Sequence, residues 1–298
     1  MNKSSRIFPI AAIAASVAAM IFRIAQILTV VDYNTMGFFD SAAPFILTNG
    51  IYIFFLLAAV IFGFGIFSDK KKGSGAYGCT AREISPKYTL IMGIAFGGGF
   101  CLQFVQLFFG EGKTGLALTG EIVTMAAYLA AAFMLLARKG INSSIGYIQL
   151  VISVSYTIKS AALFMQDTII VRVSDELILL LSYVASVIFF LALGRFISGN
   201  ETKSTKAKLL FTAAAVSVLS LSASAAGWIA YLIDISYMQK HMANHPISET
   251  AAAAIALAVI FALYGEKKEL SSEKSENEEN GSQQPANPAN SEGTAQQG

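Results

Sequence analysis

Cysteine and histidine are scarce in this chain. Its 298 residues include only two cysteines, Cys79 and Cys101, and two histidines. Cys79 falls in a basic segment and Cys101 in the middle of an apolar one, so we expect no disulfide framework and no Cys/His zinc pattern. His241 and His245 stand four residues apart near two acids and are weak candidates for metal ligands. With no third ligand evident, we expect neither a bound metal nor a cofactor.

Catalytic motifs are also missing. The sequence has no nucleophile elbow, no H-E-x-x-H, and no paired aspartates or histidine inside an apolar segment. Gly73, Gly75 and Gly78 match G-x-G-x-x-G, but this run follows an apolar helical segment instead of a strand, so it does not indicate a nucleotide site. An enzyme is therefore the weaker class of function, and we expect no nucleic-acid partner.

Charged residues are also scarce. Only 13% of the residues are charged and 55% are hydrophobic, with a mean hydropathy of +0.59, which is typical of polytopic membrane proteins. Each membrane-spanning helix needs roughly 20 apolar residues, and eight segments qualify. We place these spans at residues 9–31, 45–67, 88–109, 116–137, 146–166, 175–197, 208–233 and 248–264. The predicted fold class is all-α: a polytopic transmembrane bundle of about eight helices, arranged as four hairpins in the lipid bilayer.

The basic residues indicate how the chain lies in the membrane. Most of the 21 Lys and Arg residues fall in the segments on one side, whereas Lys113, Arg172 and Lys240 are the basic residues of the other side. By the positive-inside rule, both termini are predicted to be cytoplasmic, in a cell-membrane protein. Residues 1–265 form the transmembrane domain, and residues 266–298 form an acidic cytoplasmic tail with too few apolar residues to fold.

The first span has a second interpretation. Lys3 and Arg6 precede an apolar region with small residues near Ala19, as in a cleaved signal peptide. The apolar stretch continues to Val31, longer than a typical signal core, which favours a retained helix. Cleavage would leave seven spans and the same cytoplasmic C-terminus.

Two cations lie inside predicted spans. An Arg or Lys at the centre of a bilayer costs about 2.5 to 3.5 kcal/mol, so Arg23 and Lys159 are candidate functional residues. One hypothesis is that both line an outward-facing cavity suited to an anionic solute. The alternative is that each reaches toward the outer surface and pairs with an acid there. The acids available for such pairs are Asp32, Asp40, Glu111, Glu121, Asp167 and Asp175.

Glutamines accompany these cations on the same helical faces. Gln26 lies near Arg23, and Gln103 and Gln106 share a face of the third span. We therefore predict ligand-binding roles for Arg23, Gln26, Gln103, Gln106 and Lys159. Glu121, near the start of the fourth span, is the candidate titratable acid if transport is coupled to protons.

A faint repeat links three helix ends. Arg23 precedes Asp32, Gln103 precedes Glu111 and Lys159 precedes Asp167, each by about two helical turns. The seventh span also ends in an acid, which completes a set of four predicted acids at the outer mouth: Asp32, Glu111, Asp167 and Asp234. Duplicated units are common in transport folds, but a shared need for polar helix ends would produce the same pattern.

The first hairpin resembles a known group of proteins. Residues 23–39 read R-I-A-Q-I-L-T-V-V-D-Y-N-T-M-G-F-F. They are similar to the opening hairpin of uncharacterised multi-pass inner-membrane proteins of Clostridia-type bacteria, in which an R-x-x-Q helix leads into D-x-x-T-G-F-F. Here Met36 interrupts the T-G step. The resemblance implies a bacterial inner-membrane protein and assigns no catalytic residue.

Two functions follow as hypotheses. The first is transport or binding of a small, anionic solute in a cavity that opens outward. The alternative is a membrane scaffold or sensor that recruits partners through its outer loops or its tail, with the buried cations paired for structural reasons. The sequence identifies neither the substrate nor the oligomeric state.

Overall fold

The computed structural model is an all-α bundle. It describes residues 4–32, 38–39, 43–71, 80–81, 84–109, 115–137, 141–166, 174–200, 202–233 and 245–264. Its helices and strands are α1 (Ser4–Thr29), β1 (Val31–Asp32), β2 (Phe38–Phe39), α2 (Phe45–Lys71), α3 (Pro86–Phe109), α4 (Gly115–Ala137), α5 (Ser143–Gln166), α6 (Ser174–Ile197), α7 (Lys203–Ser220), η4 (Leu221–Ala225), α8 (Ala226–Ile233) and a C-terminal helix, Glu249–Tyr264. The predicted acidic tail, 266–298, lies outside these residues.

Length and composition make seven of the described helices able to cross a membrane. They are α1 to α6 and the continuous helix formed by α7, η4 and α8. Helices are the expected form, because a segment in lipid must satisfy its backbone hydrogen bonds within itself. The predicted polytopic helix bundle is therefore confirmed. The last predicted span, 248–264, corresponds to the C-terminal helix, which is apolar but shorter than the others.

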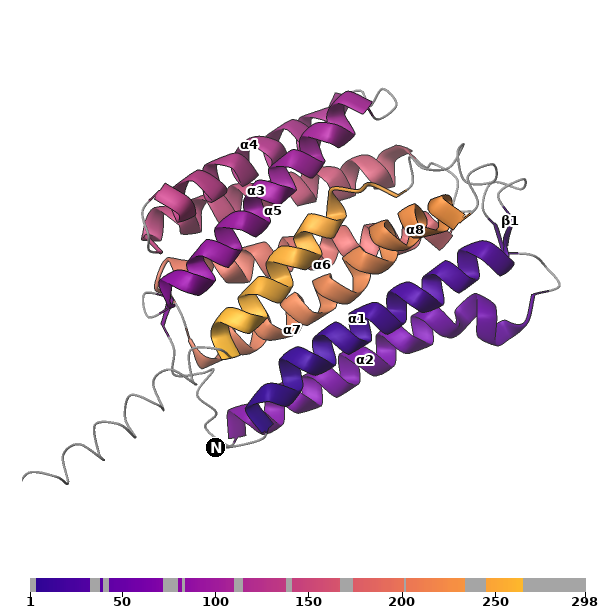
Figure 1. Ribbon diagram of the computed structural model, residues 1–298, viewed down its shortest axis with the longest axis horizontal. Helices are drawn as coiled ribbons and strands as arrows, with labels where there is room; N and C mark the ends of the chain where they lie inside the picture. The colour runs from indigo at the N-terminus through magenta and orange to yellow at the C-terminus, as the bar shows by residue number, and fades with distance from the viewer. Residues whose placement is uncertain are drawn as a thin grey trace, which may run out of the picture.

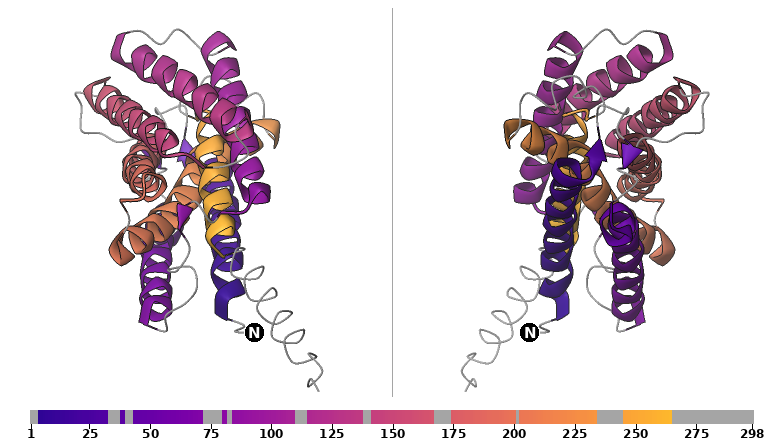
Figure 2. Two further views of the ribbon diagram at one scale, coloured as in Figure 1. Left: turned by 90° about the vertical axis from the view of Figure 1, so that its left-hand side faces the viewer. Right: turned by 90° about the vertical axis from the view of Figure 1, so that its right-hand side faces the viewer.

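The helices run side by side, with α1 and α2 along one edge of the bundle and α3 to α5 along the other (Figures 1 and 2). Neighbours from α3 to α7 pack against one another, and α1 and α2 pack on α7. A short ladder follows α1, in which Val31 pairs with Phe39 and Asp32 with Phe38 in antiparallel register. The stretch that contains Arg23 therefore continues from the end of α1 into a pair of short antiparallel strands.

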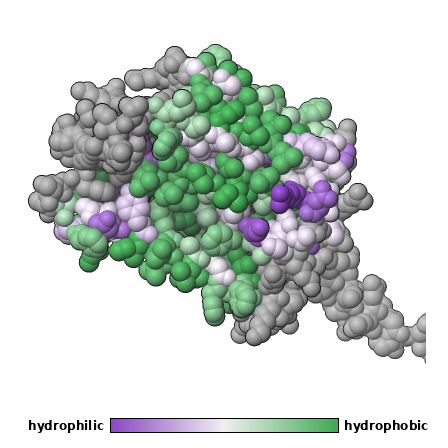
Figure 3. Space-filling view, turned by 180° about the vertical axis from the view of Figure 1, so that it is seen from behind, coloured by the Kyte–Doolittle hydropathy of each residue, from purple (hydrophilic) through white to green (hydrophobic). Residues whose placement is uncertain are grey.

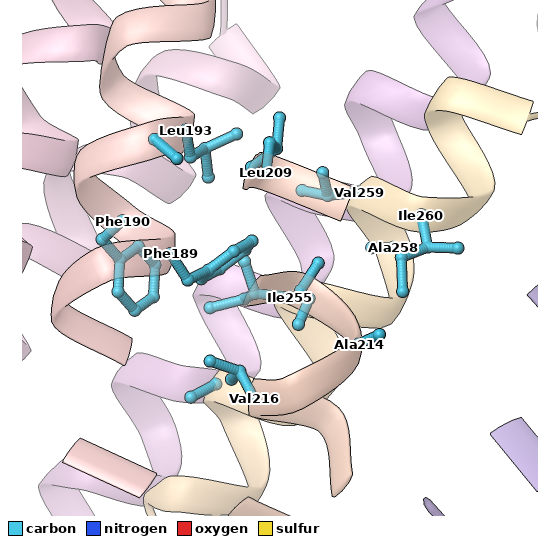
Figure 4. Close-up of a cluster of buried hydrophobic side chains, with 14 of the residues drawn as sticks. Phe189, Phe190, Leu193, Leu209, Ala214, Val216, Ile255, Ala258, Val259 and Ile260 are labelled. Atoms are coloured by element: carbon cyan, nitrogen blue, oxygen red, sulfur yellow. The ribbon is translucent and has the colours of Figure 1, made fainter. Parts of the chain in front are cut away.

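The C-terminal helix occupies the middle of the bundle. Ile255, Ala256 and Ile260 have no exposed surface. Figure 4 shows Ile255 and Val259 of this helix close to side chains of α6 and α7. Tyr264 stacks on a ring of α1, at 5.4 Å between centroids. The many alanines of this helix let the surrounding helices approach closely, which is the usual packing solution in membranes.

Small hydroxyl side chains also join the helices. The hydroxyls of Ser16 in α1 and Ser217 in α7 lie 3.0 Å apart, and those of Ser182 in α6 and Ser220 in α7 lie 2.8 Å apart. Such bonds each contribute about 0.6 to 2 kcal/mol to helix association. These serines therefore have a packing role.

The outer surface of the bundle is apolar. Phe64, Phe108 and Phe133 expose 70% or more of their surface. Hydrophobic side chains cover much of the face seen in Figure 3. A continuous apolar surface of this kind is a contact surface for lipid. The polar side chains of interest lie inside.

One segment inside the bundle departs from α-helical geometry. Residues Leu221–Ala225 form η4, a π-helical turn between α7 and α8. Such turns are rare and frequently occur at functional sites, since they redirect backbone groups. In this protein η4 lies beside the start of the C-terminal helix, where Ser224 meets Thr250 at 2.9 Å between hydroxyl oxygens.

The fold makes a testable prediction about Phe190. This fully buried ring of α6 stacks on Tyr156, with 5.5 Å between centroids. Phe190→Ala should lower the free energy of unfolding by about 3 to 5 kcal/mol, because the removed ring leaves a cavity. The matched control is Phe133→Ala, which truncates an exposed ring and should change it by about 0.5 kcal/mol at most. Unfolding in detergent measures both variants, and equal losses would contradict the packing described above.

Candidate functional site

Arg23 is the centre of one buried polar cluster. Its guanidinium, in α1, pairs through Nη2 with the carboxylate of Asp175 in the first turn of α6, and Nη1 donates to Gln26 Oε1 at 2.9 Å. Gln26 Nε2 in turn donates to the carbonyl of Leu47 at 2.6 Å. These contacts tie α1 to α6 and to the start of α2. We call Arg23, Gln26, Asp175 and His245 the arginine cluster.

His245 completes this cluster from a distant part of the chain. Its Nδ1 donates to the carbonyl oxygen of Ala223 in η4 at 2.9 Å, and its Nε2 lies 3.5 Å from Asp175 Oδ2. Trp228 Nε1 donates to the backbone carbonyl of His245 at 2.9 Å. The ring packs directly on Gly227 of α8, where a Cβ atom would overlap it. The π-helical turn and this glycine together make room for the imidazole.

Lys159 is the centre of the second buried polar cluster. Its Nζ lies 3.1 Å from Glu121 Oε2 and 3.1 Å from Glu249 Oε1. Gln103 Nε2 donates to Glu121 Oε2, and Gln106 Nε2 lies 3.4 Å from Glu121 Oε1. We call these five residues the lysine cluster. They come from α3, α4, α5 and the C-terminal helix, so four helices meet at one ammonium group.

Tyrosine rings surround this ammonium. Lys159 Nζ lies 4.8 Å from the ring centre of Tyr156 and 5.3 Å from that of Tyr183. The hydroxyls of Tyr128 and Tyr156 lie 3.0 Å apart. Aromatic faces attract a cation, so the rings and the two carboxylates together favour the charged form of the lysine. One ammonium therefore faces two carboxylates.

A short segment connects the two clusters. It runs from His245 to Glu249 and reads H-P-I-S-E, with the helix beginning at Glu249. His245, Ser248 and Glu249 are buried, and the backbone N–H of Ser248 donates to Gln106 Oε1 at 3.1 Å. We call these five residues the connecting segment. One of its ends contacts the arginine cluster and the other the lysine cluster.

The connecting segment lies inside the bundle, at a level well before the end of the neighbouring helix α5. Lys159 is about two helical turns, roughly 10 Å, before the last residue of α5, and Glu249 meets it there. The C-terminal helix therefore begins inside the bundle. Non-helical backbone at membrane depth occurs only where protein buries it or where it lines a cavity. A carboxylate in the first turn is favourable, since the N-terminus of a helix carries a partial positive charge.

Several polar atoms of these clusters lack hydrogen-bond partners within the described residues. They are Gln103 Oε1, His245 Nε2, Ser248 Oγ and Glu249 Oε2. More than 90% of buried polar groups in proteins are hydrogen-bonded, so such a concentration is unusual. It marks the surroundings of the connecting segment as a place that can accept further hydrogen bonds.

The structure divides the candidate residues from the sequence between two clusters. Arg23 and Gln26 belong to the arginine cluster, and the other four candidates belong to the lysine cluster: Gln103, Gln106, Glu121 and Lys159. The inward orientation that helical spacing suggested for the two cations and three glutamines is found, and Glu121, expected near the outer boundary, is buried as well. Both cations also have acidic partners, as the alternative interpretation required, and two of these, Asp175 and Glu121, are among the acids considered.

None of the four acids predicted at the outer mouth has a described side chain. The side chain of Asp32 lies outside the described part of the chain, as do Glu111, Asp167, Asp234 and His241. Across the residues that are described, no group of three or more His, Cys, Asp or Glu side chains is arranged to hold a metal ion. His245 instead contacts an arginine-bound carboxylate.

Sequence reasoning missed Glu249 as a partner of Lys159. It stands at the start of the last predicted span, 248–264, where an acid looks like an ordinary helix end. Two signals were available: the last apolar segment is short, and Pro246 stands two residues before it. A short apolar segment that follows a proline and begins with an acid indicates a helix that starts within the membrane.

No known protein family, no curated protein and no solved structure matches this chain. Its class therefore follows from its own fold and composition. The apolar helices and lipid-facing surface define a multi-pass integral membrane protein. The resemblance of its first hairpin to proteins of Clostridia-type bacteria stays a prediction.

The lysine cluster makes a prediction about stability. Lys159→Met should cost about 3 to 5 kcal/mol of unfolding free energy, because it leaves two buried carboxylates without their cation. Adding Glu249→Gln should restore part of this loss by removing one carboxylate. Unfolding of the single and double variants in detergent measures this coupling. Lys87→Met, which removes an exposed lysine, is the control, and an additive double variant would show that the charges act independently.

The packing of the His245 imidazole against Gly227 makes another prediction about stability. Gly227→Ala should destabilise the protein by about 1 to 3 kcal/mol, because the added Cβ displaces the ring of His245. Gly98→Ala is the matched control, since no atom lies within 4 Å of its added Cβ and it should be neutral or slightly stabilising. Thermal unfolding compares the two, and equal behaviour would show that the ring does not need this glycine.

Proposed function

We propose that this protein transports a small polar solute across a bacterial cell membrane and binds it at the connecting segment, between the two clusters. The observation that supports this most directly is the non-helical, buried segment His245–Ser248 at the start of the C-terminal helix. In secondary transporters, discontinuous helices whose ends lie near the middle of the membrane form the substrate and ion sites.

The buried charges support the same function. An ionisable residue inside a membrane protein is costly and usually marks a substrate or ion pathway. Here Arg23, Lys159, Glu121, Asp175 and Glu249 lie inside one bundle, with 4% or less of each side chain exposed. A scaffold has no need of so many buried charges around the start of a helix.

The chemistry of the clusters favours a solute that donates hydrogen bonds. Both cations are already held by carboxylates, so an anionic solute would first have to displace Glu249 from Lys159. The acceptors Glu249 Oε2 and Gln103 Oε1, by contrast, lack donors within the described residues. A small solute with an ammonium group would supply these donors and balance a carboxylate.

The direction of opening follows from the loop charges. The excess of Lys and Arg in the loops on one side supports cytoplasmic termini. Arg23 and Lys159 each lie about two turns before the end of a helix that runs from the cytoplasmic side to the outer side in this orientation. Both clusters then belong to the outer half of the membrane, and the site opens outward.

The test is ligand-induced stabilisation of the protein in nanodiscs. We expect at least one compound from a panel of small amines, amino acids and monocarboxylates to raise Tm, by about 2 to 4 °C for each kcal/mol of binding free energy. Glu249→Gln should abolish this shift while retaining the fold, because Glu121 still balances Lys159. Lys87→Gln, which removes an exposed charge near the start of α3, is the control and should keep the shift.

Uptake into proteoliposomes then tests transport of the compound that stabilises. A monocarboxylate whose effect depends on Lys159 would overturn the preference for an amine and support an anionic solute. If no compound stabilises the protein and Glu249→Gln lowers only its stability, the charges are structural, and the scaffold or sensor alternative replaces the transport proposal.

A further inference from the structure

Gln149 of α5 is a buried side chain that helix packing does not explain. It has no exposed surface, and neither of its amide atoms has a hydrogen-bond partner within the described residues. The other fully buried glutamines of the described chain, Gln26 and Gln103, each donate a hydrogen bond to a neighbouring helix. Glutamines inside membrane proteins usually join helices in this way, and a buried amide without a partner is unfavourable. Gln149 therefore requires another explanation.

Gln149 lies in the part of α5 that the two clusters do not occupy. It stands six residues after the start of α5, about 9 Å along the axis, and ten residues before Lys159, about 15 Å. Gln149, Tyr156 and Lys159 are all buried, and their spacing places them on one face of the helix. In the orientation of the proposed function, Gln149 lies on the cytoplasmic side of the lysine cluster.

Aromatic rings lie along this face between the lysine cluster and the glutamine. Tyr156 contacts the lysine ammonium and stacks on Phe190 of α6, with 5.5 Å between ring centroids. The edge of Tyr183 meets Tyr156 at 5.9 Å, and the hydroxyl of Tyr128 lies 3.0 Å from that of Tyr156. Ring faces attract an ammonium group, and the hydroxyls can accept hydrogen bonds from it. These side chains therefore suit the class of solute proposed above.

The backbones of α5 and α6 are in contact on the cytoplasmic side of Gln149. A Cβ atom on Gly194 would lie 3.4 Å from Gln149 Cβ and 3.0 Å from the carbonyl oxygen of Gly146. One on Gly146 would lie 2.9 Å from the carbonyl oxygen of Gly194. The two glycines let the helices close tightly beside the buried amide. Separation of α5 from α6 at these glycines would open the amide to the cytoplasm.

We propose that Gln149 is a second binding point for the solute, between the connecting segment and the cytoplasm. Its Oε1 accepts a hydrogen bond from the ammonium group, and its Nε2 donates one to an acceptor of the same solute. An amino alcohol or an amino acid has both groups. This role rests on the proposed transport function, and it narrows the solute class to amines that also carry a hydrogen-bond acceptor.

Thiol labelling in nanodiscs tests whether a solute of this class can reach the position. In a Cys79→Ser/Cys101→Ser background, Gln149→Cys carries the only thiol. The probe is 2-aminoethyl methanethiosulfonate, a small ammonium compound. The thiolate attacks the sulfur atom bonded to the aminoethyl group, so that a mixed disulfide forms and methanesulfinate leaves.

The matched control is Leu209→Cys in the same background. Leu209 also has no exposed surface and stands six residues after the start of α7. We expect mass spectrometry to show labelling of Gln149→Cys faster by roughly tenfold or more, because opening between α5 and α6 exposes this position as a populated minor state. The anionic reagent 2-sulfonatoethyl methanethiosulfonate should show a smaller ratio between the two variants.

Gln149→Leu tests the role of the amide itself. Its Tm should equal that of the parent or exceed it by up to about 4 °C, because the variant removes an unpartnered buried amide. The panel compound that stabilises the parent through Glu249 should still stabilise this variant. Its uptake into proteoliposomes should fall by roughly tenfold or more, the effect of losing one hydrogen bond to a charged group. Gln149→Asn, which keeps the amide, should retain part of the uptake.

Four results would overturn the inference. They are equal labelling of the two cysteine variants, an equal or larger ratio with the anionic reagent, a marked loss of Tm in Gln149→Leu, and unchanged uptake in that variant. Labelling is informative even if the leucine variant does not fold. In each case, a panel compound that stabilises the parent through Glu249 leaves the transport proposal standing. If no panel compound does so, both proposals fail.

Discussion

The cost of a charge in a low-dielectric interior governs this structure. Arg23 and Lys159 lie within membrane-spanning helices, where each requires a carboxylate partner. Arg23 joins α1 to the first turn of α6, and Lys159 joins α5 to α4 and to the C-terminal helix. Apolar side chains are solvated by lipid about as well as by another helix, so apolar contacts alone discriminate poorly between neighbouring helices. These ion pairs therefore specify which helices meet and at what depth.

The C-terminal helix depends on the same constraint. It is short, rich in alanine and almost wholly buried, and it begins at the depth where Glu249 reaches Lys159. Space for this arrangement comes from residues without side chains: a Cβ on Gly120 would lie 2.9 Å from Lys159 Cγ, and one on Gly227 would overlap His245. Small residues therefore let bulky charged groups fit inside a closely packed bundle.

Hydrogen bonding around the connecting segment is nevertheless incomplete within the described residues. Glu121 and Glu249 both contact Lys159 at the buried start of the C-terminal helix, and polar atoms of the connecting segment lack partners within the described residues. These unpartnered atoms can form further hydrogen bonds, which is what the proposed solute site requires.

The amino-acid sequence by itself determined the class of the protein, because apolar length and segregated charge are local properties that lipid imposes on each span. It also identified Arg23 and Lys159, since a cation in an apolar segment is conspicuous without knowledge of its neighbours. Their partners were decided by the tertiary structure alone. Asp175 lies 152 residues from Arg23, and Glu249 lies 90 residues from Lys159. No spacing rule spans such distances, because helix packing, and not sequence order, brings these charges together.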